Sequence, residues 1–181
     1  PFVTDGNASD VGDLTAARRE AAGQSSSASG YSSGGYSPPA PDETNVIDKF
    51  PFSVDTNASD VGDLTVARRQ HSGQSSSDFG YSGCGITTPP IFGVQKNEID
   101  KFPFATDTNA TDVGDATVAR NGVSGQQSTT HGYSSAGDSG PGFSNVIDKF
   151  PFASDANATD VGDLPTSVRQ SAGQSSKTFG Y

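Results

Sequence analysis

Carboxylate and amide side chains recur at a fixed spacing, and their oxygen atoms are groups that bind hard cations. In the second copy of the motif, Asp55, Asn57, Ser59 and Asp63 stand at positions 1, 3, 5 and 9 of a loop. Ca²⁺ takes oxygen ligands at a similar spacing in calcium loops, so calcium is the one cofactor that the sequence suggests. The candidate metal ligands of the four copies are Asp5, Asn7, Asp13, Asp55, Asn57, Asp63, Asp107, Asn109, Asp115, Asp155, Asn157 and Asp163.

The same residues also fit a turn between two strands that needs no metal. Position 6 of the loop is Asp60, where an EF-hand requires Gly, and no Glu follows at position 12. Asp and Asn hydrogen-bond their own backbone and tolerate left-handed conformations. We therefore predict an Asx turn, with calcium binding as the alternative.

Each copy also contains an Asn-Ala-Ser or Asn-Ala-Thr triplet, headed by Asn7, Asn57, Asn109 and Asn157. In a secreted eukaryotic chain these triplets are acceptors for N-linked glycans. Repetition of a turn sequence accounts for them equally well. N-glycosylation of the four asparagines is therefore a second hypothesis for this motif.

Residues that could catalyse a reaction do not follow the repeat. His71 and His131 occupy different repeat positions, and we expect both on loops or at the surface. A Ser-His-Asp site needs an oriented base beside one particular nucleophile, and Ser and Asp are so abundant here that chance pairs are common. Cys84 is the single cysteine, which excludes an intrachain disulfide and a Cys-based metal site. We predict no catalytic residues and a non-enzymatic protein.

An arginine recurs shortly after the acidic motif, as Arg18, Arg68 and Arg120. The fourth copy has Val168 at this position and Arg169 one place later. We expect the repeated arginine to pair with a repeated Asp rather than to bind a ligand.

A repeat of about 50 residues positions all of these side chains. The acidic motif is followed each time by a Gly-Gln segment and a Gly-Tyr pair, and its last Asp precedes that Tyr by 18 residues in all four copies. A fixed period of this length is typical of propeller blades. We expect a single repeat domain, residues 1–181, with approximate repeats 1–50, 51–102, 103–150 and 151–181, the last one incomplete.

Four short strands are predicted within each repeat. Ile and Phe favour a strand over residues 45–52, Val and Leu over 59–64, small residues over 72–77, and Phe-Gly-Tyr over 79–81. No segment keeps a period of 3.6. The sequence therefore predicts an all-β fold, a propeller of four-stranded antiparallel blades with little or no helix. Crowding at a propeller axis favours small residues, so we expect Gly23-Gln24-Ser25 and its copies innermost.

Length changes are confined to one connector of the repeat. The spans from Tyr31 to Pro51, Tyr81 to Pro103 and Tyr133 to Pro151 are 20, 22 and 18 residues. Such insertions map to loops on one face, which is often the binding face. The candidate recognition residues are Tyr36, Pro38, Pro39, Pro89, Pro90, Ile91, Phe92, Pro141 and Phe143.

Charge and hydropathy exclude several partners. The formal net charge is -10 and the pI is about 4.3, and an acidic surface repels a phosphate backbone, which argues against nucleic-acid binding. No apolar run approaches the ~18 residues needed for a membrane span, so we expect no membrane insertion.

The residues resemble kelch repeats, a family that folds as β-propellers. The kelch pattern is matched by residues 68–77, by Gly80-Tyr81, by residues 99–102 and by residues 113–115, and the first repeat adds the paired glycines Gly34-Gly35. The usual blade Trp is missing, because the chain contains none. The near-identical repeats are also similar to those of predicted structural proteins of aquatic bacteriophages.

These resemblances imply a structural or adhesion module of a phage virion or fibre, located in the virion or outside the cell. Its expected partners are other structural protein subunits, or a glycan or protein on the host surface. The alternatives are a general protein–protein interaction propeller and a calcium-binding or glycosylated extracellular fibre protein. Pro1-Phe2 matches the end of a strand that the copy ending at Tyr181 lacks. Either four blades close tightly, or the chain belongs to a larger ring or assembly, as a homo-oligomer or as part of a longer chain. The two ends would complement each other in a closed ring, with about one short strand absent.

Overall fold

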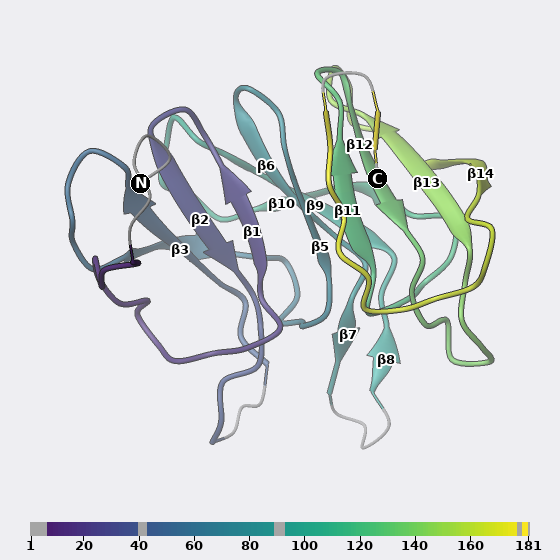
Figure 1. Cartoon of the computed structure of the whole chain (residues 1–181), viewed down its shortest axis with the longest axis horizontal. Coiled ribbons are helices and arrows are strands. Elements are labelled where there is room, and N and C mark those ends of the chain that lie inside the picture. The colour runs from purple at the N-terminus through teal and green to yellow at the C-terminus, as the bar shows by residue number, and fades with distance from the viewer. Residues whose placement is uncertain (1–6, 40–42, 89–92, 177–178, 181) are drawn as a thin grey trace.

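The computed structural model describes residues 7–39, 43–88, 93–176 and 179–180, and its regular structure there is entirely β. It contains three four-stranded antiparallel sheets and one two-stranded hairpin (Figure 1). The predicted all-β fold of four-stranded antiparallel sheets is confirmed. None of the described residues forms a helix with the length and apolar character that crossing a membrane requires.

Each large sheet is built from four strands in chain order, and the predicted strand positions are confirmed to within a few residues. The first sheet contains β1 (Ala22–Ser25), β2 (Ser29–Ser33), β3 (Val46–Pro51) and β4 (Ser59–Asp63). The second contains β5 (Ser72–Ser75), β6 (Phe79–Gly83), β9 (Glu98–Pro103) and β10 (Thr111–Asp115). The third contains β11 (Ser124–Gln127), β12 (His131–Ser135), β13 (Val146–Pro151) and β14 (Thr159–Asp163).

The register of the repeats is the same in all three sheets. The Tyr of the second strand lies opposite the Lys of the third, as Tyr31 opposite Lys49, Tyr81 opposite Lys101 and Tyr133 opposite Lys149. An irregularity recurs where the third strand meets the acidic fourth strand. The constant spacing in the sequence therefore corresponds to a constant pairing of strands.

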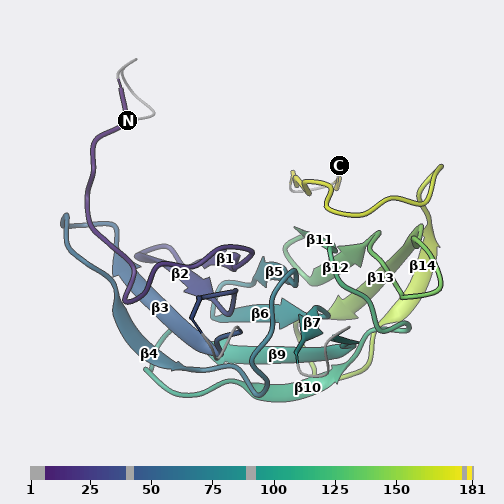
Figure 2. The ribbon, with the colours of Figure 1, turned by 90° about the horizontal axis from the view of Figure 1, so that it is seen from below.

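The small-residue strands lie beside one another, because β5 contacts both β1 and β11 (Figures 1 and 2). A Cβ atom at Gly73 would lie 2.4 Å from the carbonyl oxygen of Gly23, so a larger residue does not fit there. The Gln24 side chain donates a hydrogen bond of 3.0 Å to the carbonyl of Tyr81 in the next sheet. The Gly-Gln segments thus form the strands through which neighbouring sheets contact one another.

The apolar core lies between the sheets rather than within one of them. Tyr31, Ile47 and Leu64 of the first sheet pack against Phe102 and Ala110 of the second. Tyr81 and Ile99 of the second sheet pack in the same way against Phe150 and Ala158 of the third. Each sheet thus depends on its neighbour to cover its apolar face.

One connector contains structure that the sequence did not predict. Within the longest of the three, β7 (Ile86–Thr87) pairs with β8 (Val94–Gln95) as a hairpin. Figure 1 shows this hairpin projecting from the same end of the sheets as the other connectors. The candidate recognition residues Pro89, Pro90, Ile91 and Phe92 lie outside the described residues.

The three large sheets lie side by side along a curve (Figure 2). In this view the N-terminal segment from residue 7 projects away from the first sheet, whereas the segment from residue 165 to residue 176 passes over the third. The first and third sheets therefore differ from the second, since each has another large sheet on one side only.

Candidate functional site

The acidic motif joins one sheet to the next. The side-chain oxygen Oδ1 of Asn109 accepts a hydrogen bond of 3.1 Å from the backbone N–H of Asp63, and the N–H of Ala110 donates one of 2.8 Å to the carbonyl of Asp63. Asn157 and Ala158 hold Asp115 in the same way. Asn57 and Ala58 hold Asp13. We call this pair of hydrogen bonds the Asn clip.

A glycine beside the clip allows the two backbones to approach. Gly62 has φ 151°, and a Cβ atom there would lie 2.6 Å from the carbonyl oxygen of Thr108 in the next sheet. Gly114 stands in the same relation to Ala156. The repeated glycine of the motif is therefore required by the close contact between sheets.

An Asx turn is present, but not where it was predicted: it lies within the fourth strand rather than between the third and fourth strands, and a different Asp forms it. Oδ1 of Asp60 accepts a hydrogen bond of 3.1 Å from the N–H of Gly62. Asp10, Asp112 and Asp160 form the same bond with the glycine two residues later. The turn thus lies inside the fourth strand segment.

The structure places the remaining candidate metal ligands in ion pairs or at the exposed turns. Asp107 lies 2.8 Å from Nζ of Lys49, and Asp155 pairs with Lys101. Among the described residues, no group of three or more His, Cys, Asp or Glu side chains could hold a metal ion. Asp5 lies outside the described part of the chain.

The repeated arginine forms a buried ion pair with the Asp of the third strand. The prediction that it pairs with a repeated Asp is therefore confirmed. The pairs are Arg18–Asp48 at 2.7 Å, Arg68–Asp100 at 2.5 Å and Arg120–Asp148 at 2.9 Å. Burial lowers the pKa of the Arg18 guanidinium, against the opposing effect of Asp48.

A threonine completes each of these pairs. Thr65 donates hydrogen bonds from its backbone N–H and its hydroxyl to Asp100, at 2.9 and 2.6 Å. Thr15 and Thr117 bind Asp48 and Asp148 likewise. Because the Thr and the Arg both lie in the segment that enters the sheet and the Asp lies in its third strand, this Thr–Asp–Arg set attaches the segment to the sheet.

His71 lies on a loop, directly before β5, as predicted, but it is not at the surface, because its side chain is buried with 6% exposure. Gly34 covers the ring so closely that a Cβ atom there would lie 2.7 Å from His71 Cε1. Burial, together with the nearby charge of Arg68, lowers the pKa of His71 to about 3. For His131 the prediction of a loop or surface position is wrong, because this residue lies in β12 and is half-buried.

Cys84 is also fully buried. Burial raises the pKa of its thiol to about 11. The thiol therefore stays protonated at neutral pH, whereas a reactive cysteine needs thiolate character.

The connectors share one pattern of backbone hydrogen bonds but differ in their side chains. Tyr36 exchanges two backbone hydrogen bonds with Arg19, Ile86 exchanges the same two with Arg69, and Asp138 exchanges them with Asn121. An aromatic, an aliphatic and an acidic residue thus occupy equivalent positions at the end of the sheets that bears the hairpin.

An ionic and aromatic cluster surrounds Tyr36. The guanidinium of Arg19 lies 4.6 Å from the centre of the Tyr36 ring, and that of Arg69 lies 5.5 Å from it. Arg69 also binds Glu20 at 2.8 Å and Glu43 at 3.0 Å. Burial lowers the pKa of Arg69, but the hydrogen bonds to the two glutamates outweigh it and raise that pKa above its usual value.

The other described recognition candidates lie in the same set of connectors. Phe143 is 51% exposed, and the guanidinium of Arg169 lies 4.9 Å from the centre of its ring. Pro38, Pro39 and Pro141 are exposed. Tyr36 lies in the connector after β2, and Phe143 lies in the connector after β12.

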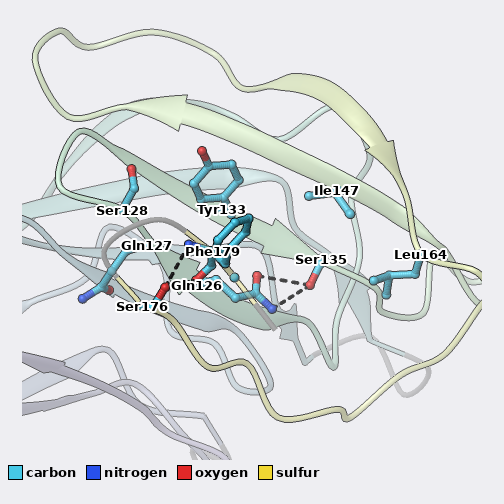
Figure 3. Close-up of a pocket in the computed structure, with 10 residues that line it drawn as sticks. Gln126, Gln127, Ser128, Tyr133, Ser135, Ile147, Leu164, Ser176 and Phe179 are labelled. Carbon is cyan, nitrogen blue, oxygen red and sulfur yellow. Dashed lines mark hydrogen bonds between the residues drawn. The ribbon is translucent and has the colours of Figure 1, made fainter.

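A cavity of about 270 Å³ lies at the far face of the third sheet (Figure 3). Tyr133, Ile147 and Leu164 line it, and Phe179 and Gly180 border it from the C-terminal segment. Gln126, also in its lining, donates a hydrogen bond of 2.9 Å to Ser135. The sequence pattern does not mark these residues as a site, although Tyr133, Ile147 and Leu164 repeat the core positions of Tyr31, Ile47 and Leu64.

Comparison with protein families found no match, and comparison with curated proteins found none either. Among solved structures, the chain is similar to one titled "Structure of YjhT", with a TM-score of 0.68 and 10% sequence identity. The similarity covers 82% of this chain and 53% of the other. This chain thus spans about half the length of that protein, and at such low identity the likeness concerns the fold alone.

Proposed function

We propose that this chain is a segment of a kelch-like β-propeller and serves as a non-enzymatic structural and adhesion module of a phage virion or fibre. Recognition in this proposal belongs to the variable connectors and not to the repeated acidic motif. The observation that carries it is the contrast between repeated side chains, which bind other parts of this chain, and connector side chains, which vary on one backbone arrangement.

The packing of the sheets supports the propeller. Three four-stranded sheets lie side by side along a curve, with β1, β5 and β11 in contact on its inner side. Propellers arrange such sheets radially, with the first strand of each nearest the axis. Similarity to a solved protein that is about one and a half times as long agrees with further sheets completing a ring.

The contacts made by the repeated polar groups support a structural role. The Asn clips, the Lys–Asp pairs and the Thr–Asp–Arg sets all join one segment of the chain to another. Buried polar groups are expected to be paired in this way when they serve the fold. None of these groups needs an external ligand to explain why it recurs.

The connectors offer chemistry suited to a host-surface glycan or protein. Tyr36 and Phe143 present aromatic rings beside guanidinium groups, and aromatic residues and arginine are enriched where proteins bind partners. Loops on a rigid scaffold are common binding elements.

A non-enzymatic role agrees with the state of the two side chains best suited to catalysis. His71 is buried and stays neutral, and Cys84 is buried and stays protonated. Neither has the combination of access and pKa near the working pH that a general base or a nucleophile needs.

Binding to host cells and to a glycan array tests the proposal. We expect the labelled chain to bind, and we expect Tyr36→Ser together with Phe143→Ser to abolish binding. Phe52→Ser is the matched control, because Phe52 is 56% exposed and its backbone bonds to the turn after β1 (Ala28), at the opposite end of the sheets. Absence of binding to every glycan and cell would contradict adhesion, and equal losses in both variants would contradict recognition by the connectors.

A further inference from the structure

One pair of contacting residues distinguishes the interface between the first and second sheets from that between the second and third. We call these the first and the second interface. His71, directly before β5, lies against Gly34, where an added Cβ atom would lie 2.7 Å from the Cε1 atom of the ring. At the second interface the corresponding residues are Val123 and Cys84, which belong to one apolar cluster. The first interface thus has an ionisable ring where the second has an apolar contact.

The His71 ring is buried in surroundings that suit its neutral form. Its Nε2 atom lies 3.4 Å from Oγ of Ser33, at the end of β2. Its Nδ1 atom has no hydrogen-bond partner within the described part of the chain. A protonated imidazole carries an N–H donor on both nitrogens. Protonation in the closed interface would therefore leave a buried donor unpaired, which is costly.

The charges that face the ring also oppose its protonation. They are the guanidinium groups of Arg68, from the segment that enters the second sheet, and Arg18, from the segment that enters the first. Each guanidinium already pairs with an aspartate of a third strand, Asp100 or Asp48. Neither carboxylate is therefore free to pair with an imidazolium. Burial and these positive charges together lower the pKa of His71 to about 3.

Backbone hydrogen bonds close the first interface around His71. The N–H of Gly35 donates a hydrogen bond of 2.9 Å to the carbonyl of Arg68. The N–H of Gln70 donates one of 3.0 Å to the carbonyl of Glu20. Because these bonds lie directly beside the buried ring along the chain, the ring reaches water only when they separate.

We propose that the connector end of the first interface is an acid-sensitive contact, where protonation of His71 favours separation of the two sheets while the second interface stays closed. Arg69, two residues before His71, reaches across the same interface to Glu20 and Glu43. Separation therefore takes the cluster around Tyr36 apart, and a partner bound there would be released in acid. The release rests on the function proposed above, whereas the separation itself does not.

Amide hydrogen exchange, measured residue by residue by NMR, tests the separation. From pH 7 to pH 5 the protection factors of Gly35 and Gln70 should fall by about tenfold or more, because the histidine of the open state, with a pKa of about 6.5, takes up a proton that the closed interface excludes. The N–H groups of Gly85 and Gly122 form the equivalent bonds, both of 2.8 Å, across the second interface. Their protection factors should change by less than about twofold, since stability differs between parts of a structure. An equal fall at both interfaces, or no fall at the first, would overturn the proposal.

A double variant is the matched control. His71→Val together with Gly34→Ala gives the first interface residue types of the third repeat, where Val123 and Ala136 occupy the two positions. Ala136 has φ 64°, so alanine accepts the backbone conformation of Gly34, whose φ is 57°. The protection of Gly35 in this variant should not depend on pH, and a pH-dependent loss that persists would contradict the proposal. If the variant does not fold, the comparison of the two interfaces in the wild type decides the outcome.

Binding to whole host cells at two pH values tests the release. At pH 4 the shift toward the open state reaches about 100-fold relative to pH 7, so wild-type chain bound at pH 7 should be released, while the double variant should stay bound. Equal release of both proteins would contradict control by His71. Absence of binding at pH 7 would contradict the proposed function, and the amide exchange result would still decide whether the interface separates.

Discussion

The two ends of the sheets differ in whether their side chains repeat. At the end that carries the β3–β4 turns, the same Asn, Lys and Asp side chains recur, and each contacts the neighbouring sheet. At the connector end the backbone bonds recur, but Tyr36, Ile86 and Asp138 differ at equivalent positions. A side chain that recurs together with its contact stabilises the fold. At a position where the backbone hydrogen bonds recur but the side chain differs, the side chain is free to bind a partner.

The buried ion pairs give the largest expected effect. Asp100→Ala leaves the fully buried Arg68 guanidinium without its carboxylate, and removing one partner of such a pair destabilises by about 3–5 kcal/mol. Urea unfolding would measure the loss, and Asp148→Ala should lose a similar amount because Arg120 is equally buried. A loss near zero in either variant would show that this repeated set is not structural.

The second expected effect is a pH dependence of the free energy of unfolding, which arises from His71 and therefore concerns one sheet only. Its pKa is about 3 in the folded chain and about 6.5 when unfolded. The unfolded chain therefore binds the extra proton first, so stability is fully present above pH 6.5 and falls as the pH falls toward 3. Between pH 6.5 and 5 the wild type should lose about 1.5 to 2 kcal/mol more than His71→Gln.

Thermal or urea unfolding at several pH values would measure this difference. Carboxylates titrate in both proteins, so their effect cancels in the comparison. Parallel pH profiles for the two proteins would contradict the low pKa of His71.

The Asn clip should contribute less than the buried pairs. Asn109→Ala removes the hydrogen bond to the N–H of Asp63, and a net loss of about 1 kcal/mol is expected for one such bond. Asn7→Ala is the matched control, because Asn7 is exposed and makes no such bond in the described structure. Urea unfolding would measure the free energy of unfolding of both variants. Equal values would show that the Asn clip does not stabilise the fold.

The Lys–Asp pairs at the surface should have the smallest effect. Lys101→Ala removes the pair with Asp155, whose side chain is 58% exposed. Exposed pairs contribute about 0–1 kcal/mol and are screened by salt. Unfolding at low and high salt would measure this, and a loss as large as that of Asp100→Ala would contradict the distinction between buried and exposed pairs.

Strand positions were predictable because they depend on local patterns. Val46–Pro51 and its copies combine β-favouring residues with a Pro at the strand end. The hairpin β7–β8 was missed because each of its strands has only two residues, too few for an alternating pattern. The burial of His71 was missed because Gly34 and Ser33, more than 35 residues away in the sequence, cover it.

The sequence by itself determined the period, the all-β character and the expectation that the repeated arginine pairs with Asp. These features follow from spacing and residue type, which are properties of the chain as written. Only the tertiary structure decided that Asn57 binds Asp13, 44 residues earlier, and that a Tyr of one sheet stacks on a Phe of the next. Such contacts depend on how neighbouring sheets pack. The motif that resembles a ligand loop within one repeat therefore connects two neighbouring sheets.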